Sequence, residues 1–183
     1  MARIILITGG SRSGKSIYAQ QIAESMAEGR TYIATCPVVD EEMKERIRKH
    51  REARRTGNWQ TIEETTDLAA ALTKAKGSAV ILIDCLTLWV NNLMYQAEVQ
   101  KQDIREEDIV DRCRDILDAC DTIYGTVIFV TNEIGMGIVP DNALSRRYRD
   151  LAGRCNQVMA HRADAVVFMV SGLPLKMKGE IMI

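Results

Sequence analysis

The chain has 183 residues, which fits one domain of ordinary size and is long enough to bury a continuous core without metals or disulfides. Its 24 Lys and Arg residues nearly balance its 25 Asp and Glu residues, and the formal net charge is -1. The composition therefore gives no global field that favours nucleic acid or an anionic membrane surface as a partner, and any basic site must be local.

The cysteines and the N-terminus indicate which class of protein this is. The five cysteines form no C-x-x-C pair and have no histidine at zinc-ligand spacing, and their odd number argues against a closed disulfide framework. The N-terminal "MARIILITGG" contains a short apolar run, but neither a cleavage site nor about 20 consecutive apolar residues. We expect a cytoplasmic protein with no membrane span and no structural metal.

Short β-branched apolar runs alternate with longer amphipathic stretches along the chain. The runs predict strands at 3–8, 31–36, 79–84, 126–131 and 165–170. The stretches between them predict helices around 15–28, 40–55, 65–76, 86–99, 105–123 and 143–162. This alternation predicts right-handed crossovers and a mostly parallel sheet covered by helices, in a single α/β domain over residues 1–183.

The first predicted strand runs into "TGGSRSGKS", residues 8–16, which matches the P-loop pattern G-x-x-x-x-G-K-[ST] at Gly9, Gly14, Lys15 and Ser16. The glycines let successive backbone N–H groups turn toward one phosphate, and the following helix adds its positive N-terminal end. Lys15 would reach the β- and γ-phosphates and Ser16 would hold Mg²⁺. A tight glycine turn that binds nothing is the alternative, but the strand before the motif and the helix after it favour nucleotide binding. We therefore expect a P-loop NTPase fold of the RecA-like type.

The second predicted strand leads into a basic helix that contains "EMKERIRKHREARR", residues 42–55. In a helix, Arg46, His50 and Arg54 would share one face at a spacing of four residues. The two guanidinium groups would disfavour a protonated imidazole, which leaves a ring nitrogen able to attack phosphorus. The residues alone favour the plainer alternative, a surface histidine on a charged helix whose glutamates make ordinary i,i+4 ion pairs with the basic residues.

The third predicted strand ends at Asp84, which we interpret as the Walker-B acid near the metal, with helix capping as the alternative. After the fourth strand, "NEIGMGIVPDN" at 132–142 is either a substrate-side loop or a plain connection. It lacks the N-K-x-D pattern of a GTPase, and the short chain favours a small-molecule phosphotransferase over a motor. Arg146, Arg147 and Arg149 then open a helix, where they would contact either phosphate or solvent.

Six segments together make the sequence resemble a known family. They are "TGGSRSGKS", "YIAT", "ERIRKHREAR", "LIDCLTLWVNNL", "VTNEIGMGIVP" and "RDLAGRCNQ". In this order, from about residue 4 to 178, they resemble the bifunctional adenosylcobinamide kinase / adenosylcobinamide-phosphate guanylyltransferase family of cobalamin biosynthesis. The resemblance implies phosphorylation of adenosylcobinamide by ATP or GTP. It then implies transfer of GMP from GTP, through a covalent guanylyl-histidine, to the phosphorylated corrinoid, which gives adenosylcobinamide-GDP.

The resemblance also implies a set of site residues. The family's guanylylated histidine corresponds to His50, and its metal site to Ser16 and Asp84 with Mg²⁺. Its nucleotide contacts correspond to Gly9, Gly10, Ser11, Arg12, Ser13, Gly14, Lys15, Ser16, Ala34, Thr35, Cys36, Arg51, Glu52, Ala53, Arg54, Glu63 and Asp84. Because Glu64 follows Glu63, the register of that carboxylate stays open.

The resemblance further implies a corrinoid substrate and a homotrimer, with no nucleic acid partner. Two alternatives remain from the residues alone. One is a P-loop kinase of another small molecule with His50 as a bystander, and the other is a regulatory module that binds nucleotide.

Overall fold

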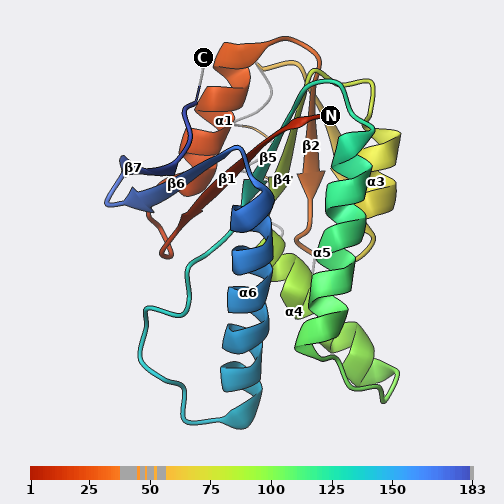
Figure 1. Ribbon diagram of the computed structural model, residues 1–183, viewed down its shortest axis with the longest axis vertical. Helices are drawn as coiled ribbons and strands as arrows, with labels where there is room; N and C mark the ends of the chain where they lie inside the picture. Colours follow the sequence, from red (N-terminus) through yellow and green to blue (C-terminus); the bar gives the residue numbers. More distant parts are fainter. Residues whose placement is uncertain (38–44, 46–47, 49–51, 53–56, 182–183) are drawn as a thin grey trace.

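A seven-stranded sheet forms the centre of the computed structural model, which describes residues 1–37, 45, 48, 52 and 57–181. The strand order is β3-β2-β4-β5-β1-β6-β7, and every neighbouring pair is parallel except β6 and β7 (Figure 1). The strands are β1 (Arg3–Gly9), β2 (Arg30–Ala34), β3 (Trp59–Glu63), β4 (Val80–Asp84), β5 (Thr126–Val130), β6 (Ala165–Val170) and β7 (Leu173–Lys178). The predicted fold class, an α/β domain with a mostly parallel sheet, is confirmed.

Helices pack on both faces of this sheet. Helix α1 (Lys15–Met26) covers one face, where it buries Ala19, Ile22 and Ala23 against the odd-numbered side chains of β1. The other face carries α3 (Leu68–Lys74), α4 (Leu86–Val99), α5 (Glu106–Asp121) and α6 (Ala143–Arg162). Because side chains alternate along a strand, the continuous apolar runs of the sequence reflect burial on both faces.

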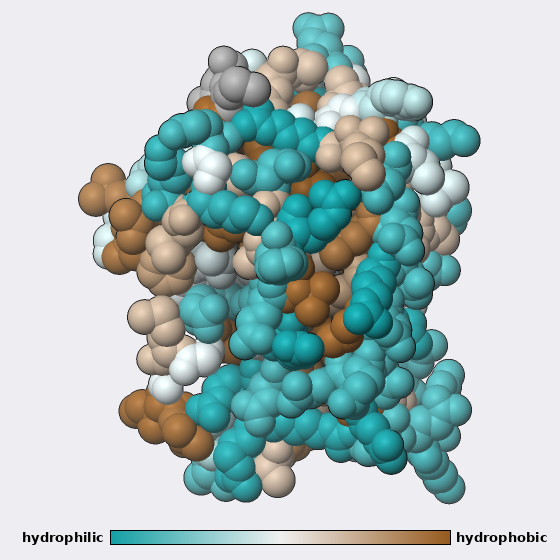
Figure 2. Space-filling model, viewed as in Figure 1, coloured by the Kyte–Doolittle hydropathy of each residue, from teal (hydrophilic) through white to brown (hydrophobic). Residues whose placement is uncertain are grey.

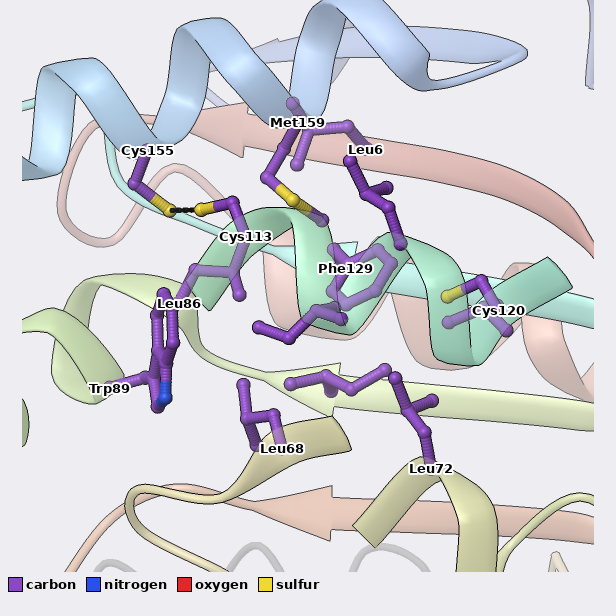
Figure 3. Packing of buried hydrophobic residues seen from close by; sticks show 14 of the residues in the cluster. Leu6, Leu68, Leu72, Leu86, Trp89, Cys113, Cys120, Phe129, Cys155 and Met159 are labelled. Atoms are coloured by element: carbon purple, nitrogen blue, oxygen red, sulfur yellow. Dashed lines mark hydrogen bonds between the residues drawn. The ribbon is translucent and has the colours of Figure 1, made fainter. Parts of the chain in front are cut away.

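The larger of the two cores lies between the sheet and helices α3 to α6. Figure 3 shows Phe129 of β5 at its centre, with Trp89 of α4 on one side and Met159 of α6 on another. Cys113 and Cys155 meet in this core with their sulfur atoms 3.6 Å apart, and all five cysteines are free thiols. Burial raises the pKa of Cys120 to about 12, so this thiol packs as a small apolar side chain.

Two strands were not predicted, and both lie at the edges of the sheet. β3 falls between the predicted helices around 40–55 and 65–76, and β7 follows the last predicted strand. The side chains of β3 are half-buried or exposed and those of β7 are all exposed, so neither strand has a long apolar run. The sequence does contain a hairpin signal there, namely the dipeptide Ser171-Gly172. Both residues have positive φ in the two-residue turn between β6 and β7, as hairpin turns of this length require.

The strand order brings three functional segments to one edge of the sheet. β5 lies between β1 and β4, and the register aligns Asp84 with Val130 and Val130 with Ile7. The loops after β1, β4 and β5 therefore leave the sheet side by side at its carboxyl edge, where open α/β sheets place their ligands.

The surface is polar over much of the view in Figure 2, but hydrophobic side chains gather at the left margin, over the β6–β7 hairpin and the loop before α6. The exposed apolar residues there include Met136, Ile138, Val139, Leu173 and Met177. In the part of the chain that the structure describes, no helix is both long enough and apolar enough to cross a membrane.

Candidate active site

The loop between β1 and α1 has the backbone of a phosphate cradle. Gly9 and Gly14 have φ of 152° and 91°, and Gly14 is the N-cap of α1. A Cβ atom on Gly9 would lie 2.5 Å from the carbonyl oxygen of Met169 and 2.8 Å from Oγ of Ser13. Only glycine therefore fits at this position, and the predicted strand–loop–helix context of the motif is confirmed.

The polar groups of this loop fit a bound phosphate. Oγ of Ser13 is buried and has no hydrogen-bond partner in the described part of the chain, and such a group favours a ligand that satisfies it. Nζ of Lys15 is buried at the base of the loop and donates to the Gly10 carbonyl oxygen over 3.0 Å. Desolvation lowers the pKa of Lys15, while the nearby Cys85 and Asp84 act in the opposite direction. A bound polyphosphate would stabilise the charged form of this lysine.

Asp84 ends β4 on the same side of the site, as predicted. Helix α4 begins after Cys85, and its N-cap position has no side-chain hydrogen bond, so Asp84 does not cap this helix. Instead, Oδ2 of Asp84 accepts a hydrogen bond of 3.1 Å from the Tyr32 hydroxyl on the neighbouring strand β2. The sequence analysis did not identify Tyr32 as a site residue, because the contact depends on which strands are neighbours.

A buried polar network anchors the loop that follows β5. Oγ1 of Thr131 donates to Oδ1 of Asn156 over 2.7 Å and lies 3.2 Å from Oγ1 of Thr87. Nδ2 of Asn156 donates to the carbonyl oxygen of Asn132, whose own N–H donates to Oγ1 of Thr87. The next residue, Glu133, donates its backbone N–H to the carbonyl oxygen of Gly9 over 3.0 Å. The start of the 131–142 loop is therefore held against the phosphate cradle.

The comparisons with known proteins match this arrangement to one family. The family model described as cobinamide kinase / cobinamide phosphate guanyltransferase matches residues 5–177. The chain belongs to this family. The match covers the cradle, Asp84, the buried network and most of the β6–β7 hairpin, so these parts of the site lie within the segment that the cobinamide kinase / guanyltransferase family model matches.

Two curated relatives show how similar the chain is to named proteins. It is 43% identical over 176 residues to the bifunctional adenosylcobalamin biosynthesis protein CobP of Pseudomonas aeruginosa, with 96% of this chain and 97% of the relative covered. It is 39% identical over 182 residues to CobU of Salmonella typhimurium, with 96% and 99% covered. The resemblance stated from the sequence is therefore confirmed over nearly the whole chain.

Solved structures of lower similarity agree on the fold. The flagellar accessory protein FlaH of Methanocaldococcus jannaschii is 12% identical and superposes with a TM-score of 0.54 over 98% of this chain and 79% of its own. The ATP synthase subunit NeqB of Nanoarchaeum equitans is 16% identical and superposes with a TM-score of 0.58 over 91% of this chain and 45% of its own. At these identities, the similarity concerns the P-loop fold alone.

The nucleotide contacts expected from the family lie in different surroundings. Thr35 is fully buried, and its Oγ1 accepts from the N–H of Cys85 and donates to the Cys85 carbonyl oxygen. Its side chain would have to break these bonds to contact a nucleotide, whereas its neighbours Ala34 and Cys36 are partly exposed. The hydrogen bonds of Thr35 therefore connect the end of β2 to the end of β4.

Glu63 and Glu64 lie in different surroundings. The Glu64 carboxylate accepts hydrogen bonds from the backbone N–H groups of Thr66 and Asp67. Desolvation raises the pKa of Glu64, but these backbone bonds outweigh it and leave the pKa below its usual value. Glu64 thus stabilises a turn, and Glu63 is exposed at the carboxyl end of β3, opposite Ala34.

The segment that contains His50 is described only at three residues. Glu45, Arg48 and Glu52 have helical backbone, and Arg48 forms ion pairs of 2.6 and 2.5 Å with the two glutamates. The predicted i,i+4 pairing is confirmed for Arg48 and Glu52, whereas Arg48 and Glu45 pair at i,i+3. The first pair occupies the Glu52 carboxylate. His50, Arg51, Ala53 and Arg54, as well as Arg46, lie outside the described residues.

The buried network leads to a prediction about stability. Replacing Asn156 with alanine removes the bond from Oγ1 of Thr131 and leaves the Asn132 carbonyl without its side-chain donor. We therefore expect the free energy of unfolding to fall by roughly 2–4 kcal/mol. Denaturant titration of wild type and variant measures the change. The adjacent Gln157 is exposed, and Gln157→Ala should stay within about 0.5 kcal/mol of wild type. Equal stability of the two variants would contradict a structural role for the network.

Proposed function

We propose that this chain is a bifunctional enzyme of cobalamin biosynthesis that works in the cytoplasm. It phosphorylates the hydroxyl of adenosylcobinamide with ATP or GTP and then transfers GMP from GTP to the phosphorylated corrinoid. The observation that carries the proposal is the family match over residues 5–177 in a chain whose phosphate cradle has the required glycines and a buried lysine. The product is adenosylcobinamide-GDP.

The kinase half of the proposal uses the cradle and the end of β4. Backbone N–H groups of Gly9 to Ser16 hold the nucleotide phosphates, and Lys15 neutralises charge on the transferred phosphoryl group. Ser16 and Asp84 would hold Mg²⁺, which would supply further neutralisation of the phosphate charge. The Lys15 ammonium is close enough to Asp84 for the carboxylate to oppose the lowering of its pKa, which supports one shared site for the two residues.

The transferase half uses His50 as the nucleophile. A ring nitrogen attacks the α-phosphorus of GTP, the bond to the bridging oxygen breaks, and pyrophosphate leaves. An oxygen of the acceptor's phosphate then attacks the same phosphorus, the P–N bond breaks, and the imidazole is restored. The spacing of Arg46 and Arg54 in the sequence supports their role in keeping the imidazole neutral and in stabilising the departing pyrophosphate.

The resemblance stated from the sequence implies the remaining nucleotide contacts of the proposal. They are the cradle residues Gly9, Gly10, Ser11, Arg12, Ser13 and Gly14, the strand-end residues Ala34, Thr35, Cys36 and Glu63, and Arg51, Glu52, Ala53 and Arg54. The partly exposed position of Ala34 and Cys36 beside Asp84, at the carboxyl edge of the sheet, supports the second group.

A product assay tests the proposed function. Purified protein is incubated with adenosylcobinamide, Mg²⁺ and either ATP alone or ATP with GTP, and the corrinoids are identified by mass spectrometry. We expect a corrinoid heavier by one phosphoryl group with ATP alone, and one that carries GDP when GTP is present. An unchanged corrinoid in both reactions would leave only another kinase substrate or a regulatory role.

We also propose that the chains assemble, as a homotrimer by family resemblance. The exposed apolar residues of the β6–β7 hairpin and the loop before α6 support this, because monomers rarely expose large contiguous apolar patches (Figure 2). Light scattering of the purified protein measures the assembly. The mass of a single chain at micromolar concentration would contradict it.

Tyr32 leads to a prediction about the metal. Replacing Tyr32 with phenylalanine removes the hydrogen bond that orients the Asp84 carboxylate. It keeps the aromatic ring, which packs edge-on to Trp59 with 6.3 Å between the ring centroids. We expect the Mg²⁺ concentration for half-maximal kinase activity to rise about three- to tenfold, with nucleotide affinity in the absence of Mg²⁺ unchanged. Tyr124→Phe, at an exposed site, is the control. An unchanged Mg²⁺ requirement in Tyr32→Phe would contradict the positioning role.

A further inference from the structure

A groove of about 570 Å³ runs along α6 beside β1, the strand that leads into the P-loop. Its lining includes Thr8, Glu133, Arg149 and Gln157. Thr8 immediately precedes Gly9 of the cradle, and the N–H of Glu133 donates to the Gly9 carbonyl oxygen. Leu6, which also lines the groove, belongs to the core on the α6 face, whereas α1 packs on the opposite face. The groove therefore reaches the phosphate cradle from the side of β1 that faces away from α1.

The three arginines that open α6 have different surroundings. Arg146 donates to the carbonyl oxygens of Pro140 and Asp141 at the end of the loop. Arg147 pairs with the Asp103 carboxylate and donates to the Ile104 carbonyl oxygen. These two arginines hold neighbouring segments of the chain, so their guanidinium groups are already occupied.

Arg149 is different. Its side chain is only 21% exposed, and its single ion pair in the described part of the chain is with the exposed Asp150, over 3.7 Å. That distance is too long for a hydrogen bond, and a guanidinium has five N–H donors. Arg149 thus lines the groove with donors available to a ligand.

The groove holds a second polar group that lacks a partner. Oγ1 of Thr8 is buried and makes no hydrogen bond to any described residue. A hydroxyl in this state costs free energy unless water or a ligand satisfies it. Acidic groups also line the groove, namely Glu106, Glu133 and Asp150, and Oε1 of Glu133 accepts from the N–H of Gly135. This mixture of charges suits a ligand that carries both hydrogen-bond donors and an anionic group.

We propose that this groove binds the arm of the acceptor that carries the reacting hydroxyl and, after phosphorylation, its phosphate. Arg149 contacts that phosphate, and the Thr8 hydroxyl contacts the arm in both states. The volume lies within the usual range for small-molecule sites, roughly 300–1,000 Å³, so it fits an arm while the corrin ring lies outside. The inference rests on the proposed function, because only that function supplies an acceptor with and without phosphate.

Steady-state kinetics of Arg149→Ala test this inference. We expect the KM for adenosylcobinamide-phosphate in guanylyl transfer to rise roughly 10- to 100-fold, because a charge-assisted hydrogen bond is lost. The KM for adenosylcobinamide in the kinase reaction should change less than about threefold, and labelling of the protein by GTP alone should not change. Arg149→Lys, which keeps the charge, should recover part of the loss.

Two further variants keep the test independent of folding. Arg114 of α5 lies outside the groove lining, is exposed and pairs with Asp111 over 2.8 Å, so Arg114→Ala should match wild type for both acceptors. Thr8→Val keeps the shape of the side chain and should raise the KM of both acceptors by a similar factor, about three- to tenfold. Thermal unfolding verifies that each variant is folded.

The outcomes separate the two proposals. An active wild type with Arg149→Ala indistinguishable from Arg114→Ala overturns the acceptor groove alone. Equal changes in both KM values, or loss of protein labelling by GTP, in a folded Arg149→Ala protein also overturn it, because Arg149 would then not recognise the acceptor's phosphate. A wild type that modifies no cobinamide overturns the proposed function and the groove together.

Discussion

Replacing His50 with alanine is expected to lower guanylyl transfer to the acceptor by at least about 1,000-fold, with kinase activity within about threefold of wild type. The imidazole is the proposed attachment point of GMP, and alanine has no group that can form a bond to phosphorus. In the proposed mechanism, phosphoryl transfer instead depends on the cradle and Asp84. The two rates are measured with α-labelled GTP and γ-labelled ATP on the same preparation.

The chain contains its own control for this substitution. His161, the only other histidine, is exposed near the C-terminal end of α6, so His161→Ala should keep both activities. Label on the wild-type protein should be acid-labile and alkali-stable, as expected for a phosphoramidate, and absent from His50→Ala. If a folded His50→Ala protein also lost kinase activity, the division of labour between His50 and the cradle would be wrong.

Replacing Lys15 with methionine is expected to lower kinase activity about 1,000-fold or more, because it removes the cation that neutralises charge on the transferred phosphoryl group. The fold should survive. Desolvation lowers the pKa of Lys15, so burying its charge is costly, and methionine fills a similar volume without that cost. Phosphorylation of adenosylcobinamide measures the activity, and thermal unfolding measures the stability.

Lys74, exposed at the end of α3, is the matched control, and Lys74→Met should retain full kinase activity. The same Lys15→Met protein also reports on the second reaction. Loss of labelling by GTP would mean that the cradle holds the nucleotide for both reactions, and normal labelling would mean a separate mode of binding. Kinase activity within tenfold of wild type in Lys15→Met would contradict the assignment of the cradle.

Local features of the site could be predicted from the sequence, but contacts across the sheet could not. The P-loop is encoded in nine consecutive residues, and Asp84 ends an unmistakable apolar run. The bond from Tyr32 to Asp84 depends on β2 and β4 being neighbours with Ala34 opposite Asp84, which no single segment specifies. The network of Thr87, Thr131 and Asn156 likewise joins three elements that are distant in the chain.

The edge strands, β3 and β7, likewise could not be predicted from their own sequence. Buried strands are detected by runs of apolar residues, whereas β3 and β7 have polar or exposed side chains and take their structure from one neighbouring strand. Among the arginines that open α6, sequence spacing could not separate Arg149 from Arg146 and Arg147. Only the positions of Asp103 and Pro140 do so, because those residues occupy the other two guanidinium groups.

The claim that one chain carries GMP on its own histidine and delivers it to a phosphorylated corrinoid is tested most directly by a chase. Protein labelled with α-labelled GTP is freed of nucleotide and then mixed with adenosylcobinamide or with adenosylcobinamide-phosphate. We expect the label to move from the protein to the corrinoid with the phosphorylated acceptor and to remain on the protein with the other. Protein that never becomes labelled, or label that stays on the protein with both acceptors, would contradict the proposed function.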